Sequence, residues 1–301
     1  MGGIFVITFK DIELKDKALF DQYFAARNYE SSESTFTDLF IWRNSDQLKY
    51  TMIQDYLCIV AKYRHLYPYA FSPLCMGEGT YDKVLPVLAD CFHSEGFPLV
   101  LKAVTEDRKR EMEEALPGKL IFCEDRSNYD YVYSTKELIE LKGKKFRQKR
   151  NHINKFKKSY EYQYEALNDT NLSECLDTEL VWISGKEGDE SILEEKRAVY
   201  DILTNYRALK VTGGVLRING SVQAFTLGEL LNPNMAVTHI EKANTDYDGS
   251  FPIMNQLFTA KAWFHIPYIN REEDMGIQGM RKAKESYHPV RMIKKYTGFY
   301  I

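Results

Sequence analysis

A charged segment near the C-terminus combines the side chains that acid–base and anion-binding chemistry needs. It reads NREEDMGIQGMRKAKESYHP and covers residues 270–289. A carboxylate there would orient or deprotonate an amine or hydroxyl, and cations at helical spacing would hold a phosphate or carboxylate. Ion pairs that only join a helix to a strand are the structural alternative. The candidate base or orienting residues are Glu273 and Asp274. The candidate substrate-binding residues are Arg271, Arg281, Lys284, Tyr287 and His288.

A second candidate lies on the expected strand MAVTHIEKA, residues 235–243. His239 and Glu241 are two positions apart, so they would share one face of the strand at a separation of about 7 Å. Two titratable groups at that separation are suited to proton transfer. A buried histidine beside a structural carboxylate is the commoner outcome and is the alternative for this pair.

The third candidate is a cationic run, KGKKFRQKRNHINKFKK, at residues 142–158, with nine Lys or Arg and no acid. Phe146, Ile153 and Phe156 recur at helical spacing, so an apolar stripe can pack while the cations face solvent. In a chain of net charge −3, this run favours a polyanion such as tRNA or an anionic membrane surface. Pairing with the acidic loop 185–190 is the alternative. The residues selected for polyanion binding are Lys144, Lys145, Arg147, Lys149, Arg150 and Lys155.

The elements that must position these side chains are expected in the same order twice: strand, two helices, three strands, helix, strand, helix, strand. No residue-level repeat accompanies this pattern. The pattern predicts an α+β chain of two units, each a mixed sheet flanked by helices, and its order resembles that of GNAT-type acyltransferases, so by analogy we expect two tandem GNAT-like units. The expected division is a first unit at 1–135, a basic connector helix at 136–158, and a second unit at 159–301 that carries the site.

Other features limit the function classes. No secretory signal and no apolar run long enough to cross a bilayer is found, so we expect a cytoplasmic protein that at most touches an anionic membrane. The five scattered cysteines lack metal-ligand spacing, and GxGxxG, GxxxxGK[ST], GxSxG and HExxH are absent. No metal is therefore expected. The sequence leaves the oligomeric state open.

The segments discussed above also carry a family resemblance. Four segments resemble the phosphatidylglycerol lysyltransferase C-terminal-domain proteins. They are KKFRQKRNHINKF (144–156), HIEKAN (239–244), YINREEDMGIQGMRKAKESYHP (268–289) and RMIKKY (291–296). These are stand-alone relatives of the catalytic domain of lysyl-phosphatidylglycerol synthases. The resemblance covers nearly the whole chain.

The resemblance implies a tandem GNAT-like architecture of the Fem type and an aminoacyl-tRNA donor. The expected activity is transfer of an aminoacyl or acyl group from an activated ester to an amine or hydroxyl of a lipid or peptide. Such an ester needs positioning and oxyanion stabilisation rather than a protein nucleophile. The alternatives are an acyl-CoA-dependent N-acyltransferase and a non-catalytic polyanion-binding module. No cofactor is expected, and acetyl-CoA or another acyl-CoA is disfavoured because the segment 247–251 has a single glycine, Gly249, where coenzyme A-binding members have more.

Overall fold

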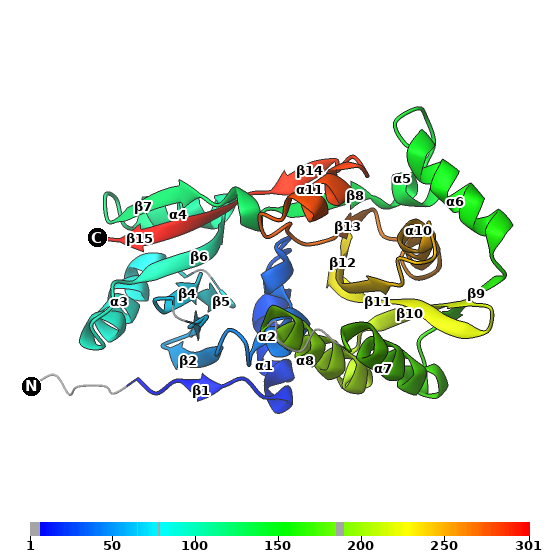
Figure 1. Ribbon diagram of the computed structural model, residues 1–301. Coiled ribbons are helices and arrows are strands. Elements are labelled where there is room, and N and C mark those ends of the chain that lie inside the picture. Colours follow the sequence, from blue (N-terminus) through cyan, green and yellow to red (C-terminus); the bar gives the residue numbers. More distant parts are fainter. Residues whose placement is uncertain (1–6, 65, 78, 185–189) are drawn as a thin grey trace, which may run out of the picture. The chain divides into compact units, whose positions relative to one another are not determined.

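The computed structural model describes residues 7–64, 66–77, 79–184 and 190–301 (Figure 1). The chain divides into two compact units, each with its own sheet. Unit 1 comprises Met1–Tyr129 and Ile293–Ile301, and unit 2 comprises Asp130–Met292. Within the described ranges, no helix has the length and apolar character that crossing a membrane requires.

The sheet of unit 1 has the strand order β1-β2-β3-β4-β6-β15-β7, with β5 paired to β3. Its strands are β1 (Lys10–Asp11), β2 (Lys49–Ile53), β3 (Tyr56–Ala61), β4 (Tyr69–Phe71), β5 (Leu74–Cys75), β6 (Val100–Thr105), β7 (Leu120–Glu124) and β15 (Lys295–Tyr300). Its helices are α1 (Lys17–Ala25), α2 (Phe36–Trp42), α3 (Leu85–Ser94) and α4 (Glu106–Ala115), with 3₁₀ turns at Leu14–Asp16, Ser32–Ser34, Tyr81–Lys83 and Arg126–Asn128. The core between sheet and helices is apolar, with Leu88, Leu101 and Met112 fully buried.

The sheet of unit 2 has the order β14-β8-β13-β12-β11-β10-β9. Its strands are β8 (Asp130–Ser134), β9 (Tyr162–Ala166), β10 (Thr212–Ile218), β11 (Ser221–Asn232), β12 (Met235–Ala243), β13 (Tyr268–Asn270) and β14 (Arg291–Ile293). Its helices are α5 (Thr135–Glu140), α6 (Arg147–Ser159), α7 (Asp169–Ile183), α8 (Glu190–Thr204), α9 (Tyr206–Leu209), α10 (Ser250–Ala262) and α11 (Gln278–Glu285). Both α10 and α7 pack on β11, from opposite faces of the sheet (Figure 1).

The closing strands depart from the division expected at residue 135. β8, which we expected to close the first unit, pairs antiparallel with β13 in unit 2. β15, which we expected to close the second unit, pairs with β6 and β7 in unit 1. The connector expected at 136–158 belongs to unit 2 as α5 and α6. A strand's local pattern reports its burial but not its distant partner, so the sequence carried no signal for this exchange.

Helix α6 packs by the apolar stripe expected from its sequence. Phe146, Ile153 and Phe156 are buried in the core of unit 2. The helix lies close to the start of α10, where Gly249 has a φ of +93° and a Cβ would lie 2.8 Å from the His152 carbonyl oxygen. Glycine is therefore required at this position, because it alone combines the left-handed backbone with the close approach. This packing fixes which side chains of α6 face the interior.

Candidate active site

His239 occupies an irregular position in the sheet. The pairing register of β11 with β12 shifts between Leu227 and Gly228, and His239 is left without a partner residue. This is a β-bulge, which redirects the side chain at the extra residue. The strict alternation that predicted a shared face for His239 and Glu241 therefore does not apply, and the two side chains have different partners.

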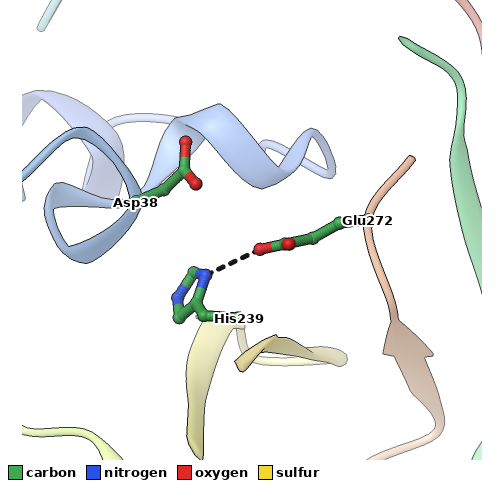
Figure 2. A group of neighbouring side chains, drawn as sticks. All are labelled: Asp38, His239 and Glu272. Carbon is green, nitrogen blue, oxygen red and sulfur yellow. Dashed lines mark hydrogen bonds and ion pairs between the residues drawn. The ribbon is translucent and has the colours of Figure 1, made fainter. Parts of the chain in front are cut away.

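Two carboxylates hold the His239 ring. Its Nδ1 lies 2.8 Å from Glu272 Oε1 and its Nε2 lies 3.0 Å from Glu229 Oε1; Figure 2 shows the bond to Glu272. Burial disfavours the imidazolium, but the bonds and charges of the two glutamates outweigh it and raise the pKa of His239 to about 10. Both ring nitrogens thus donate, which leaves no nitrogen to accept a proton at neutral pH. The geometry favours a structural role over the acid–base role that we expected.

Asp274 has its acceptor sites filled by protein donors. Arg281 donates to it through Nε and Nη2, both at 2.8 Å, the Tyr131 hydroxyl donates at 2.6 Å and the Gly276 N–H at 2.8 Å. Burial opposes ionisation, yet these donors hold the pKa of Asp274 well below its usual range. A carboxylate this strongly bound is a poor base, and the fork of Arg281 is occupied. Both residues brace the turn before α11.

Lys284 and His288 are likewise engaged with the backbone. Lys284 Nζ donates to the carbonyl oxygen of Arg271 at 2.6 Å and to that of Glu273. Burial lowers the pKa of Lys284. His288 Nε2 lies 3.2 Å from the Lys145 carbonyl oxygen. Lys284 thus ties α11 to the segment after β13, and His288 contacts the segment that leads into α6.

Arg271 and Glu241 form the polar centre of the site. Arg271 Nη2 donates to Glu241 Oε1 at 2.9 Å, and the two side chains are only 12% and 14% exposed. Asn255 of α10 donates to the other oxygen of Glu241 at 3.2 Å. The Arg271 guanidinium also lies 4.9 Å from the ring centroid of the buried Tyr287. Three of the expected site residues are thus brought together.

Lys149 completes this cluster. Its ammonium lies 3.9 Å from the ring centroid of Tyr287, and burial together with the charge of Arg271 lowers its pKa to about 8, while Glu241 opposes the shift. We expected Lys149 to face a polyanion. The missed signal was its spacing, four residues before Ile153 and seven before Phe156, which places it on the buried face of α6.

The other cations of the run divide into paired and unpaired sets. Lys145 bonds to Glu137 at 2.8 Å, Lys155 bonds to Asp248 at 2.7 Å, and Arg150 bonds to the carbonyl oxygens of Gly143 and Leu141. The acidic loop considered as a partner lies, over 185–189, outside the described residues. Within the described part of the chain, four cations of the run are exposed and have no ion pair: Lys144, Arg147, Lys157 and Lys158.

Comparisons with known proteins place this chain in a family. The model of the family described as "Phosphatidylglycerol lysyltransferase, C-terminal" matches residues 24–299. A conserved protein of unknown function from Bacteroides thetaiotaomicron is 35% identical, with a TM-score of 0.90 and coverage of 98% of this chain and 100% of that one. L-PGS from Bacillus licheniformis has a TM-score of 0.64 at 13% identity, covering 95% and 92%. An uncharacterised protein of Mycoplasmoides gallisepticum is 27% identical over 179 residues; the match spans 56% of this chain and 56% of that curated relative.

Two further structures confirm the expected architecture. A tandem GNAT protein from the clavulanic acid biosynthesis pathway has a TM-score of 0.52 at 9% identity, covering 97% of this chain and 98% of that one. FemX has a TM-score of 0.57 at 8% identity, with 96% of each chain covered. At these identities the likeness concerns the fold alone. The fold is α+β, with two mixed sheets flanked by helices as in tandem GNAT and FemX structures.

His239→Gln is expected to abolish a pH dependence of stability. The ordinary pKa is 6.5 and the folded one about 10, so the stabilisation is complete below pH 6.5 and is lost as the pH rises towards 10. Between about pH 7 and 8 the free energy of unfolding should fall by about 1.4 kcal/mol per pH unit for this one proton. Denaturant unfolding measures the slope in each protein. Equal slopes in the wild type and the variant would show that His239 is not held as an imidazolium.

Lys149 is expected to titrate apart from the other lysines. After reductive methylation with ¹³C-formaldehyde, its resonance should shift with a midpoint near pH 8, because burial and Arg271 disfavour its charge. Arg271→Met should raise that midpoint, since it removes a nearby cation and leaves Glu241. Arg147→Met, on the exposed side of α6, is the matched control and should leave it unchanged. A midpoint near the ordinary 10.5 in the wild type would contradict the assignment.

Proposed function

The chain belongs to the phosphatidylglycerol lysyltransferase C-terminal family, and from this premise we propose that unit 2 transfers an aminoacyl or acyl group from an activated ester to an amine or hydroxyl. The observation that carries the proposal is the position of Lys149, whose ammonium lies 3.9 Å from the Tyr287 ring centroid next to the buried Arg271–Glu241 pair; burial there lowers its pKa to about 8. A base with a pKa near the working pH combines a useful neutral fraction with adequate basicity.

Each member of the cluster has a task in the proposed reaction. Neutral Lys149 accepts the proton of the acceptor N–H or O–H as that atom attacks the ester carbonyl. The new C–N or C–O bond forms, the ester C–O bond breaks, and the leaving hydroxyl recovers the proton from Lys149. The cationic Arg271 stabilises the oxyanion formed in between. Glu241 positions Arg271 and, by its charge, limits the fall in the pKa of Lys149.

The exposed face of α6 suits the donor. An aminoacyl-tRNA presents a polyanion next to its ester, and the four unpaired cations defined above would bind phosphates while Lys149 on the same helix faces inward. The names of L-PGS and of the lysylphosphatidylglycerol synthetase domain of Agrobacterium fabrum, at a TM-score of 0.63 and 12% identity, make lysyl-tRNA and phosphatidylglycerol the first donor and acceptor to try. A peptide amine is the second acceptor.

Lys149→Met is expected to reduce transfer strongly. With labelled lysyl-tRNA and phosphatidylglycerol vesicles, or a peptide amine, the loss should be about 10²- to 10⁴-fold, which is the usual contribution of a general base. In the wild type the rate should rise with pH up to about 8, as Lys149 loses its proton, and Lys149→Arg should lack this rise. Lys145→Met, an exposed lysine on the segment leading into α6, is the control and should keep the wild-type rate.

Three results would overturn this assignment. A fully active Lys149→Met variant would remove Lys149 from the mechanism. Transfer from an acyl-CoA but from no aminoacyl-tRNA would favour the N-acyltransferase alternative. Binding of tRNA without transfer to any acceptor tried would favour the polyanion-binding module.

Neutralising the unpaired cations is expected to weaken tRNA binding. Changing Lys144, Arg147, Lys157 and Lys158 together to Gln should lower affinity by at least about tenfold and reduce the slope of log K against log salt by about 3, because four phosphate contacts are lost. Gel shifts over a range of salt concentrations measure both. Lys145→Gln with Lys155→Gln removes two cations that are already ion-paired and should have a smaller effect per charge. Binding that is absent or insensitive to salt would refute the RNA contact.

A further inference from the structure

Unit 1 contains a buried cation that no carboxylate among its described residues neutralises. Arg108, in the first turn of α4, is only 5% exposed. Its Nη1 donates to the Tyr81 hydroxyl at 3.0 Å and to the carbonyl oxygens of Pro73 at 3.2 Å and Ser72 at 3.5 Å. No carboxylate of the described residues lies within ion-pair distance of its guanidinium. The charge is therefore solvated only by neutral groups.

Such a residue is costly to keep. Removing an ionised group from water costs several kcal/mol, and neutral acceptors recover only part of that. All three hydrogen bonds use Nη1, so Nε and Nη2 have no protein acceptor among the described residues. The free edge of a guanidinium is a fork whose geometry matches a carboxylate.

Arg108 lines a small, shallow depression that is partly open to solvent. Arg27, Tyr29, Tyr56 and Glu111 contribute to the same wall. Arg27 is paired with Glu111 at 2.6 Å, and the Tyr29 ring centroid lies 4.6 Å from the Arg108 guanidinium. Among the described residues of the lining, the two guanidinium groups and one carboxylate sum to one net positive charge.

We infer that this depression in unit 1 binds the carboxylate of a small molecule or chain end, with Arg108 as its charge partner. One net positive charge matches a singly charged anion, whereas a phosphate dianion would leave an excess negative charge in a partly desolvated site. The Tyr29 ring over the guanidinium, with the tyrosines Tyr56 and Tyr81 of the same lining, provides an apolar wall for the carbon attached to the carboxylate. This site is separate from the transferase cluster of unit 2 and does not depend on it.

The test uses the full chain and sodium acetate. Saturation transfer from the protein to the acetate methyl group is measured by NMR at constant ionic strength, with inorganic phosphate as competitor. Wild type should show saturable transfer, and Arg108→Gln should weaken acetate binding by at least about tenfold, because a charge-assisted pair is lost. Arg110→Gln, an exposed arginine on the same helix, is the matched control and should bind like wild type.

A second variant keeps the test decisive if Arg108→Gln does not fold. Glu111→Gln removes the carboxylate found among the described lining residues, so acetate should bind about threefold more tightly or better. Unchanged acetate binding in Arg108→Gln, unchanged affinity in Glu111→Gln, or no transfer in wild type would each overturn the proposal. Phosphate that competes more strongly than acetate would overturn the assignment to a carboxylate.

Discussion

The ion pair between Arg271 and Glu241 is the interaction on which the candidate site depends. Both side chains are largely buried, so removing one partner would leave an uncompensated charge at a cost of about 3–5 kcal/mol. Replacing both by apolar residues is often neutral for stability, so stability alone does not explain why a protein keeps such a pair. Its consequence here is electrostatic. Burial and then the charge of Arg271 lower the pKa of Lys149 to about 8, and Glu241 limits the fall.

The segment with the highest density of charge forms the frame around this pair. Asp274 and Arg281 close the turn that leads into α11, and Lys284 holds the carbonyl oxygen of Arg271 itself. His239, clamped by two glutamates at the bulge in β12, immobilises Glu272, the residue that follows Arg271. Rigid support of this kind is what a positioned functional group requires. The residues with the most evident chemistry therefore orient others, and the proposed base, Lys149, comes from the helix that we expected to bind a polyanion.

Much of this arrangement was predictable from the residues. Periodicity predicts the apolar stripe of α6. The strand–helix order predicts the two sheets flanked by helices and the placement of Arg271 at a strand end. Which charges pair with which did not follow. Asp274 meets Tyr131 from a strand 143 positions earlier in the chain, and Lys149 lies against Tyr287, which is 138 positions later. Spacing gives the face of a helix, but the partner on that face is set by tertiary packing.

The exchange of closing strands shows the same limit. β8 and β15 each read as an ordinary strand, and their burial is what local pattern reports. Each strand pairs with the sheet edge that is available after the rest of that sheet has formed. The local sequence of a strand does not contain this information. Unit boundaries therefore need coordinates, even where every element is correctly expected.

The most direct measurement of the central claim is a crystal structure of the full chain with a non-hydrolysable aminoacyl-adenosine, in which an amide replaces the ester. The account predicts that the amide carbonyl carbon lies beside Lys149 with its oxygen turned towards Arg271, close enough for Lys149 Nζ to reach an incoming acceptor atom at about 2.6–3.2 Å. An analogue bound elsewhere on unit 2, with Lys149 still closed over Tyr287 and distant from the carbonyl, would contradict it.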